Sequence, residues 1–126
     1  MSTMRDMGSL LLSRWDFFAG LLWEHLEISL LAIAIAILAG GLAGILISEI
    51  RPAAKPALGL VSLLYTIPSI SMLGFLIPFS GVGNATAVIA LTIYALLPMV
   101  RGTYTGMSHI QPALLAAAKG TGSTRF

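Results

Sequence analysis

A stretch of twenty residues without a charge, ISLLAIAIAILAGGLAGILI at Ile28–Ile47, limits the folds open to this chain more than any other feature. At about 1.5 Å per residue, a helix of this length covers the roughly 30 Å hydrocarbon core of a bilayer. The alternation AIAIAI is typical of a strand, but the length of the apolar run favours a helix. We expect a transmembrane helix over residues 28–48. It is too long for a signal-peptide core and follows an acid-rich segment, so we expect it to stay in the mature chain.

Two further uncharged runs predict a second and a third transmembrane helix, at residues 57–79 and 81–100. Pro68 lies near the middle of the first run and predicts a kink or local unwinding, because its nitrogen cannot donate and its ring clashes with the Leu64 carbonyl. Pro98 predicts a bend near one end of the other run. The sequence therefore predicts an all-α membrane protein with three transmembrane helices.

The composition excludes several other classes of protein. Charged residues make up 10% of the chain, against roughly one quarter in a soluble globular domain. Seven basic side chains spread over 126 residues form no dense patch, which argues against nucleic-acid binding. The chain has no cysteine, and His25 and His109 lie far apart, so we expect no disulfide, metal site or cofactor. The pattern contains no nucleophile–base pair, acid pair or phosphate-binding loop, so we do not expect an enzyme.

The basic residues predict the direction of the spans, because short cytoplasmic loops retain lysine and arginine. Five of the seven lie after the first span or after the third, on what would be one side of the membrane. They are Arg51, Lys55, Arg101, Lys119 and Arg125. We expect this side to be the cytoplasm, which puts residues 1–27 outside and residues 101–126 inside.

Residues 15–28, WDFFAGLLWEHLEI, combine aromatic and leucine side chains with acids just ahead of the first span. Trp15 and Trp23 suit the membrane interface, where an indole keeps one edge wet. We expect an interfacial helix here, while an aromatic cage for a cation is the alternative. Within the span, the Gly40-x-x-x-Gly44 spacing favours close helix packing inside one bundle, and a dimer contact is the alternative.

The tail ALLAAAKGTGSTRF, at residues 113–126, has strong helix formers after a proline that suits a helix start. We expect a short surface helix from near Pro112, ended by Gly120 and Gly122. Its small-residue face would consist of Ala113, Ala116, Ala117 and Gly120. The composition alone does not separate this helix from a frayed tail.

Residues 65–126 resemble the permease subunits of bacterial ATP-binding-cassette importers for osmoprotectants such as glycine betaine, carnitine and choline. The resemblance rests on the TIPS kink, on the LLP-VR-TY-G pattern at the end of the third span, and on the tail, and it extends upstream through LLWEHLEISLLAIAIAI. It implies a membrane permease bundle in the bacterial cytoplasmic membrane. Such permeases have at least two more spans after the tail, so the chain resembles a truncated permease.

The tail is similar to the coupling motif of that family, Glu-Ala-Ala-x-x-x-Gly. The motif falls on Ala116, Ala117, Ala118 and Gly122, with Ala116 in the glutamate position. The resemblance implies a cytoplasmic coupling helix that docks on an ATP-binding subunit. It also implies a second permease subunit and an external substrate-binding protein as partners.

A quaternary-amine substrate needs a polar or aromatic route through the bilayer. The candidates for such a pathway are Tyr65, Thr66, Ser69, Thr92 and Tyr94. Their alternative role is structural, with hydroxyls bonding the backbone around Pro68 and tyrosines filling helix contacts. The leading hypothesis is therefore a transport subunit, and the alternative is a small self-associating membrane protein with a structural or regulatory role.

Overall fold

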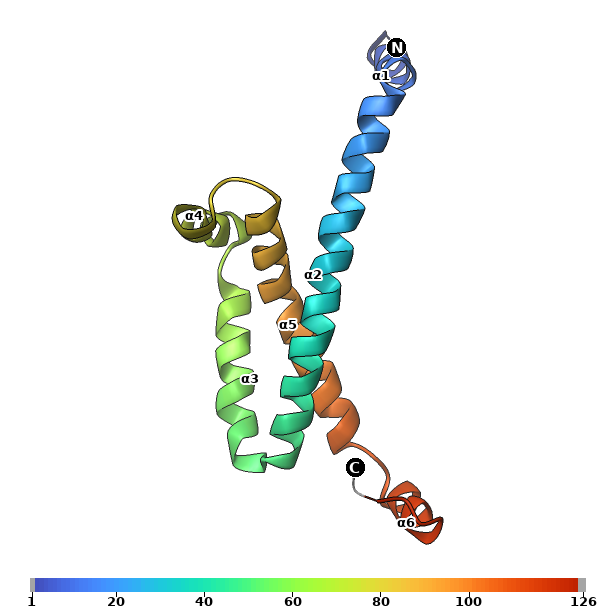
Figure 1. Cartoon of the computed structure of the whole chain (residues 1–126), viewed down its shortest axis with the longest axis vertical. Helices are drawn as coiled ribbons and strands as arrows, with labels where there is room; N and C mark the ends of the chain where they lie inside the picture. Colours follow the sequence, from blue (N-terminus) through green and yellow to red (C-terminus); the bar gives the residue numbers. More distant parts are fainter. Residues whose placement is uncertain (1, 125–126) are drawn as a thin grey trace.

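The computed structural model describes residues 2–124, which fold into helices without any strand. The all-α class expected from the sequence is confirmed. Figure 1 shows an elongated molecule in which α3 and α5 lie beside the lower part of α2. The helices are α1 (Ser2–Ser13), α2 (Trp15–Glu49), α3 (Arg51–Thr66), α4 (Ser69–Ser80), α5 (Asn84–Ser108) and α6 (Pro112–Gly120). Arg125 and Phe126, at the end of the expected cytoplasmic segment, lie outside the described residues.

Helix α2 joins the expected interfacial segment and the expected first span in one continuous element. Its 35 residues correspond to a length of about 52 Å. No proline interrupts the chain between Trp15 and Glu49, and Gly20 does not break the helix. Residues 15–28 are therefore the first part of α2 and not a separate interfacial helix. Figure 1 shows this part, with α1 at its end, projecting beyond the other helices.

The second expected span is broken at Pro68. Helix α3 ends at Thr66, α4 begins at Ser69, and their axes differ by 94°. Ile67 and Pro68 between them have extended backbone angles. Helices α2 and α5 are each long and apolar enough to cross a membrane, and a third crossing is present if the α3–α4 pair counts as one span.

The most extensive helix contact joins α2 to α5 through a row of small residues spaced four apart on α2. The row consists of Ala32, Ala36, Gly40 and Gly44, all buried. A Cβ atom at Gly40 would lie 2.7 Å from Cβ of Met99, and one at Gly44 would lie 2.6 Å from Cβ of Thr103. Both distances are shorter than any ordinary carbon–carbon contact. The two glycines thus serve packing inside one chain, as the sequence favoured, and not a free dimer face.

Helix α5 passes the expected end of the third span at Val100 and continues to Ser108 through Pro98. A short connection then leads to α6, which has Pro112 at its first position, as expected. After Gly120 the chain turns, and Gly122 has a φ of 83°, a left-handed value that favours glycine. Figure 1 shows α6 beyond the far end of α5, apart from the packed helices.

Candidate functional site between α3 and α5

Two of the sequence candidates meet where α3 faces α5. The ring centroids of Tyr65 and Tyr94 lie 6.0 Å apart, with an interplanar angle of 75°. This edge-to-face arrangement is a favourable one for aromatic pairs. The hydroxyl of Tyr94 donates a hydrogen bond to the Ile67 carbonyl at the helix break. Tyr94 is half-buried, whereas 52% of Tyr65 is exposed, so one ring of the pair is accessible.

The other three candidates do not join this pair through any described hydrogen bond. Thr66 Oγ1 donates to the Leu63 carbonyl over 2.6 Å, which is the backbone-bonding role that the sequence left open. Ser69 is exposed at the start of α4. The hydroxyl of Thr92 is buried and has no hydrogen-bond partner among the described residues.

A second polar contact crosses the same helix pair. Nη2 of Arg101 on α5 donates to Ser62 Oγ on α3 over 3.2 Å, and Ser62 Oγ donates to the Leu58 carbonyl over 2.6 Å. The sequence alone identified Arg101 only as one of the basic residues that predict membrane orientation and as part of the LLP-VR-TY-G pattern. Ser62 lies 39 positions from Arg101, so no local spacing pairs them. We call Ser62, Tyr65, Tyr94 and Arg101 together the α3–α5 seam.

The residues of the coupling-like motif lie on α6 and the turn after it. Ala116, Ala117 and Ala118 are exposed, as is every other residue of α6. The turn is closed by a 3.0 Å hydrogen bond from the Ser123 amide to the Ala118 carbonyl, beside the left-handed Gly122. Lys119 in the last turn suits the negative end of the helix dipole. The motif therefore forms a small, accessible helical knob.

At the opposite end of the α2–α5 pair, two acidic residues accept hydrogen bonds: the one from Asn84 joins the two helices, and the one from Trp23 lies within α2. Nδ2 of Asn84 donates to Glu24 Oε1 over 2.6 Å, and Nε1 of Trp23 donates to Glu27 Oε1 over 2.6 Å. An open cavity of about 460 Å³ lies beside these contacts. It is lined by Glu27, Ile28, Leu31, Asn84, Ala85, Val88 and Ile89. Among the described residues, no three His, Cys, Asp or Glu side chains gather in a way that could hold a metal ion.

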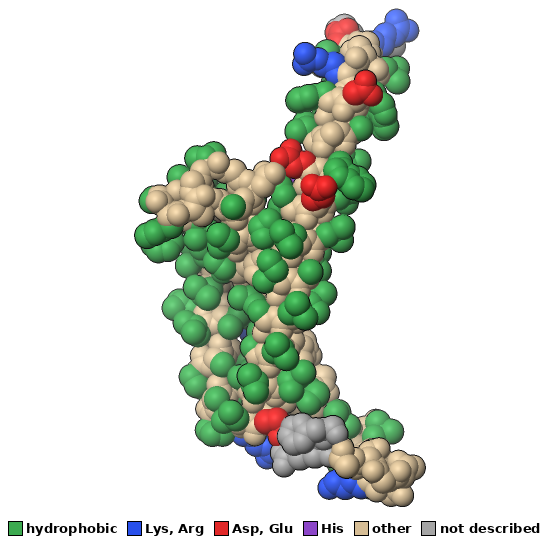
Figure 2. Space-filling view, viewed as in Figure 1, with side chains coloured by type: hydrophobic (Ala, Val, Ile, Leu, Met, Phe, Trp, Pro, Cys, Tyr) green, Lys and Arg blue, Asp and Glu red, His purple; other side chains and the backbone are tan. Residues whose placement is uncertain are grey.

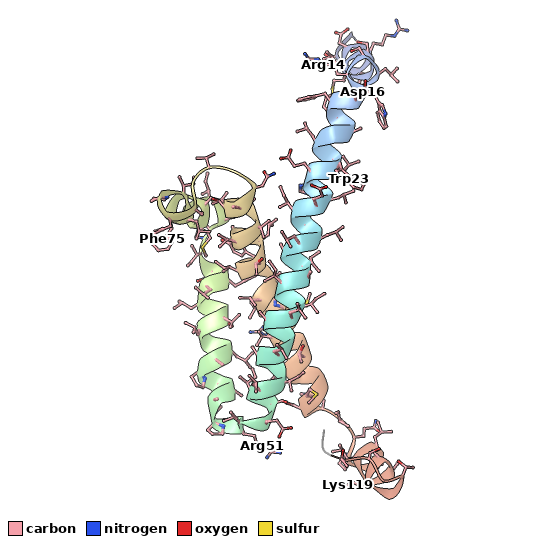
Figure 3. All side chains as sticks on the ribbon, viewed as in Figure 1. Arg14, Asp16, Trp23, Arg51, Phe75 and Lys119 are labelled. Carbon is pink, nitrogen blue, oxygen red and sulfur yellow. The ribbon has the colours of Figure 1, made fainter. Side chains whose placement is uncertain are left out.

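Charge is distributed along the long axis of the molecule. Figure 2 shows hydrophobic side chains over the middle of the visible face and most charged side chains toward the two ends. Figure 3 places Arg51 at the α2–α3 turn and Lys119 on α6 at one end, with Arg14 and Asp16 at the other. The end with Arg51 and Lys119 is the more basic of the two, because the sequence has no acid after Glu49.

The chain is similar to transport permeases. It is 42% identical over 104 residues to a carnitine transport permease protein of Listeria monocytogenes, covering 82% of this chain and 48% of that protein. It is 40% identical over 119 residues to an osmoprotectant import permease protein of Salmonella typhimurium, covering 90% and 55%. A choline transport system permease protein of Bacillus subtilis is 37% identical over 102 residues, covering 81% and 47%.

The chain spans about half the length of these curated relatives. No protein-family model matches it. No solved structure matches it either.

Proposed function

Because this chain is a homologue of osmoprotectant transport permeases over most of its length, we propose that it is a permease subunit of an ATP-driven importer. It would pass a small quaternary-amine osmoprotectant, such as glycine betaine, carnitine or choline, across the bacterial cytoplasmic membrane. The observation that carries this proposal is the 42% identity to a carnitine transport permease over 104 residues. Helices of membrane-spanning length and apolar composition support it.

The distribution of charge supports the proposed orientation. With the basic end of the molecule in the cytoplasm, α1 and the projecting part of α2 lie outside and α6 lies inside. An external binding protein would then deliver substrate at the α1 end, and a cytoplasmic ATP-binding subunit would meet α6. A second permease subunit completes the pathway. Hydrolysis of ATP is the task of the ATP-binding partner.

The coupling role of α6 is supported by its exposure and its small side chains. A partner surface can approach Ala116, Ala117 and Ala118 closely, because their methyl side chains are too small to hold the partner away from the α6 backbone. Ala116 replaces the glutamate of the family motif. The contact with the ATP-binding subunit would therefore depend on the shape of α6 and not on a carboxylate. Gly122 fixes the end of the knob through its left-handed backbone.

Co-purification tests this role. An importer complex carrying Ala117→Leu should retain about tenfold less ATP-binding subunit than wild type, because overpacking of a close contact costs roughly 1–3 kcal/mol. Gly8→Leu is the control, since Gly8 on α1 has open space around it and lies at the other end of the molecule. Equal retention of the ATP-binding subunit in both variants would count against the coupling role.

Uptake tests transport itself. Cells that express the importer containing this chain, with its ATP-binding and substrate-binding partners, should accumulate radiolabelled osmoprotectant. Cells lacking the ATP-binding subunit serve as the control. Absence of uptake despite normal membrane insertion would contradict the proposed function.

A further inference from the structure

The contact between α2 and α5 widens toward the end of the molecule that carries α1. The two helices run in the same direction, because Gly44 meets Thr103 at one end of the contact and Asn84 bonds to Glu24 at the other. Along α2 the contact row changes from glycine to alanine, and the next position in the row, Ile28, is large. Larger side chains hold helix axes further apart. Figure 1 shows α5 crossing α2 closely in its lower half and standing away from it at its start.

The open cavity of about 460 Å³ lies in this wedge and involves no residue of the α3–α5 seam. Its polar lining residues are Glu27, the last charged residue before the uncharged run at Ile28–Ile47, and Asn84, the first residue of α5. Leu31 and Val88 line it one turn further along each helix, about 6 Å deeper. Because the uncharged run covers the hydrocarbon core, the cavity has a polar mouth at the membrane boundary and an apolar wall inside it.

The polar mouth favours a cation that can donate hydrogen bonds. The Glu27 carboxylate accepts one hydrogen bond, from Trp23, whereas an ionised carboxylate has about four acceptor sites. Asn84 uses its amide nitrogen on Glu24, so its Oδ1 atom is available as an acceptor. Along the chain, the arginine or lysine nearest to Glu27 is Arg14, thirteen residues away or about 19.5 Å of helix.

We propose that this cavity binds a membrane phospholipid whose headgroup carries a primary ammonium, with the ammonium on Glu27 and Asn84 and part of an acyl chain along the apolar wall. A primary ammonium has three N–H donors, so it can bond to both residues at once. The volume lies within the range of about 300–1,000 Å³ that is usual for ligand sites. The inference goes beyond the proposed function, because it needs the chain to lie in a membrane and does not need it to transport anything.

A transported osmolyte fits this cavity less well than a lipid does. A quaternary ammonium has no N–H to donate to the mouth, and a small osmolyte has no hydrocarbon tail to cover Leu31 and Val88. A phospholipid has both parts in the order that the cavity requires, with the headgroup at the membrane boundary and the tail in the core.

A helix of a partner protein is the other competing occupant. An apolar helix that filled the wedge would press against the Glu27 carboxylate and exclude water from it, and an ionised carboxylate is costly to desolvate without a partner. A lipid headgroup brings its own cation and leaves the mouth hydrated. The charge at Glu27 therefore favours lipid.

The test measures which lipid the full chain retains. The chain is purified in detergent with the subunits that accompany it, mixed with equal amounts of phosphatidylethanolamine, phosphatidylcholine and phosphatidylglycerol of identical acyl chains, and freed of excess lipid. Mass spectrometry should show phosphatidylethanolamine enriched about tenfold over the other two, the gain expected for charged hydrogen bonds. Glu27→Gln should remove most of this enrichment. Asp16→Asn should keep it, because Asp16 lies on the same helix outside the cavity.

A second pair of variants probes the space in the cavity. Ala85 is a lining residue on α5, so Ala85→Leu fills part of the space that the lipid needs. It should lower the retained phosphatidylethanolamine about tenfold, the loss expected for overpacking. Gly106→Leu is the matched control, because Gly106 lies on the same helix outside the cavity and has open space around it.

Four outcomes would overturn the inference. They are equal enrichment in Glu27→Gln and Asp16→Asn, stronger retention of phosphatidylglycerol than of phosphatidylethanolamine, and displacement of the bound lipid by glycine betaine or choline, which would assign the cavity to the solute. The fourth is protection of Ala85→Cys from a water-soluble maleimide after lipid is removed, which would place a protein subunit in the cavity. None of these measurements involves uptake, so the proposed function is tested separately.

Discussion

Replacing Gly44 by alanine should loosen the contact between α2 and α5. The added Cβ would lie 2.6 Å from Cβ and 2.9 Å from Cγ2 of Thr103, and 3.0 Å from the Val100 carbonyl oxygen. The Cβ of Thr103 and the Val100 carbonyl move only with the α5 backbone, so a rotamer change cannot relieve the clash. Restoring ordinary contacts of about 3.5–4.0 Å requires the helices to separate by about 1 Å.

Two opposing effects set the expected change in the free energy of separating α2 from α5. Overpacking of a close contact destabilises by about 1–3 kcal/mol, while alanine in place of a mid-helix glycine gains up to about 1 kcal/mol of helix propensity. Gly41→Ala isolates the second term, because Gly41 lies on the same helix with nothing within 4 Å of its added Cβ. Relative to Gly41→Ala, Gly44→Ala should therefore lower the free energy of separating α2 from α5 by about 1–3 kcal/mol.

A single buried cysteine can report this separation, since the chain has no native cysteine. Ala90 is 5% exposed on α5, so Ala90→Cys should react with a maleimide only when α5 moves away from its neighbours. Labelling across a titration with sodium dodecyl sulfate gives the separation midpoint in each glycine background. Identical midpoints for Gly44→Ala and Gly41→Ala would refute the reasoning from close approach.

Two further substitutions probe the polar contacts of α5. Thr86 is 2% exposed, and its hydroxyl forms a hydrogen bond of 2.7 Å with Ser80 Oγ. Thr86→Val should therefore destabilise the chain by about 1–2 kcal/mol in the same titration. An unchanged midpoint would contradict this. Tyr94→Phe removes the hydroxyl that bonds the Ile67 carbonyl, and amide exchange around the helix break should accelerate about tenfold. Tyr104→Phe is its control, because no described residue receives a hydrogen bond from that hydroxyl, and equal exchange in the two variants would argue against the role of Tyr94.

Helices that depend on a short stretch of sequence were predicted correctly. The apolar run at Ile28–Ile47 lies within α2, and Pro112 opens α6. The break at Pro68 follows from the missing donor and the ring clash of proline. Its 94° bend was not predictable, because the extended backbone at the break is held from another helix, where Tyr94 bonds the Ile67 carbonyl.

Features that depend on distant parts of the chain escaped prediction. The sequence separated residues 15–28 from the first span on polarity, but backbone hydrogen bonding continues through them as one helix. The aromatic residues of the candidate site were found by type, because a quaternary-amine substrate needs a polar or aromatic route through the bilayer. Arg101 was not, because its partner Ser62 lies on another helix and its charge already had an explanation in membrane orientation.

The unbroken length of α2 has a mechanical consequence. A rod of about 52 Å works as a lever, and a tilt of about 5° at its Glu49 end displaces its Trp15 end by about 4.5 Å. The tight glycine contact with α5 sits near the Glu49 end. A small rearrangement there is therefore magnified at the free tip of the helix, where it would be easiest to measure by a distance probe.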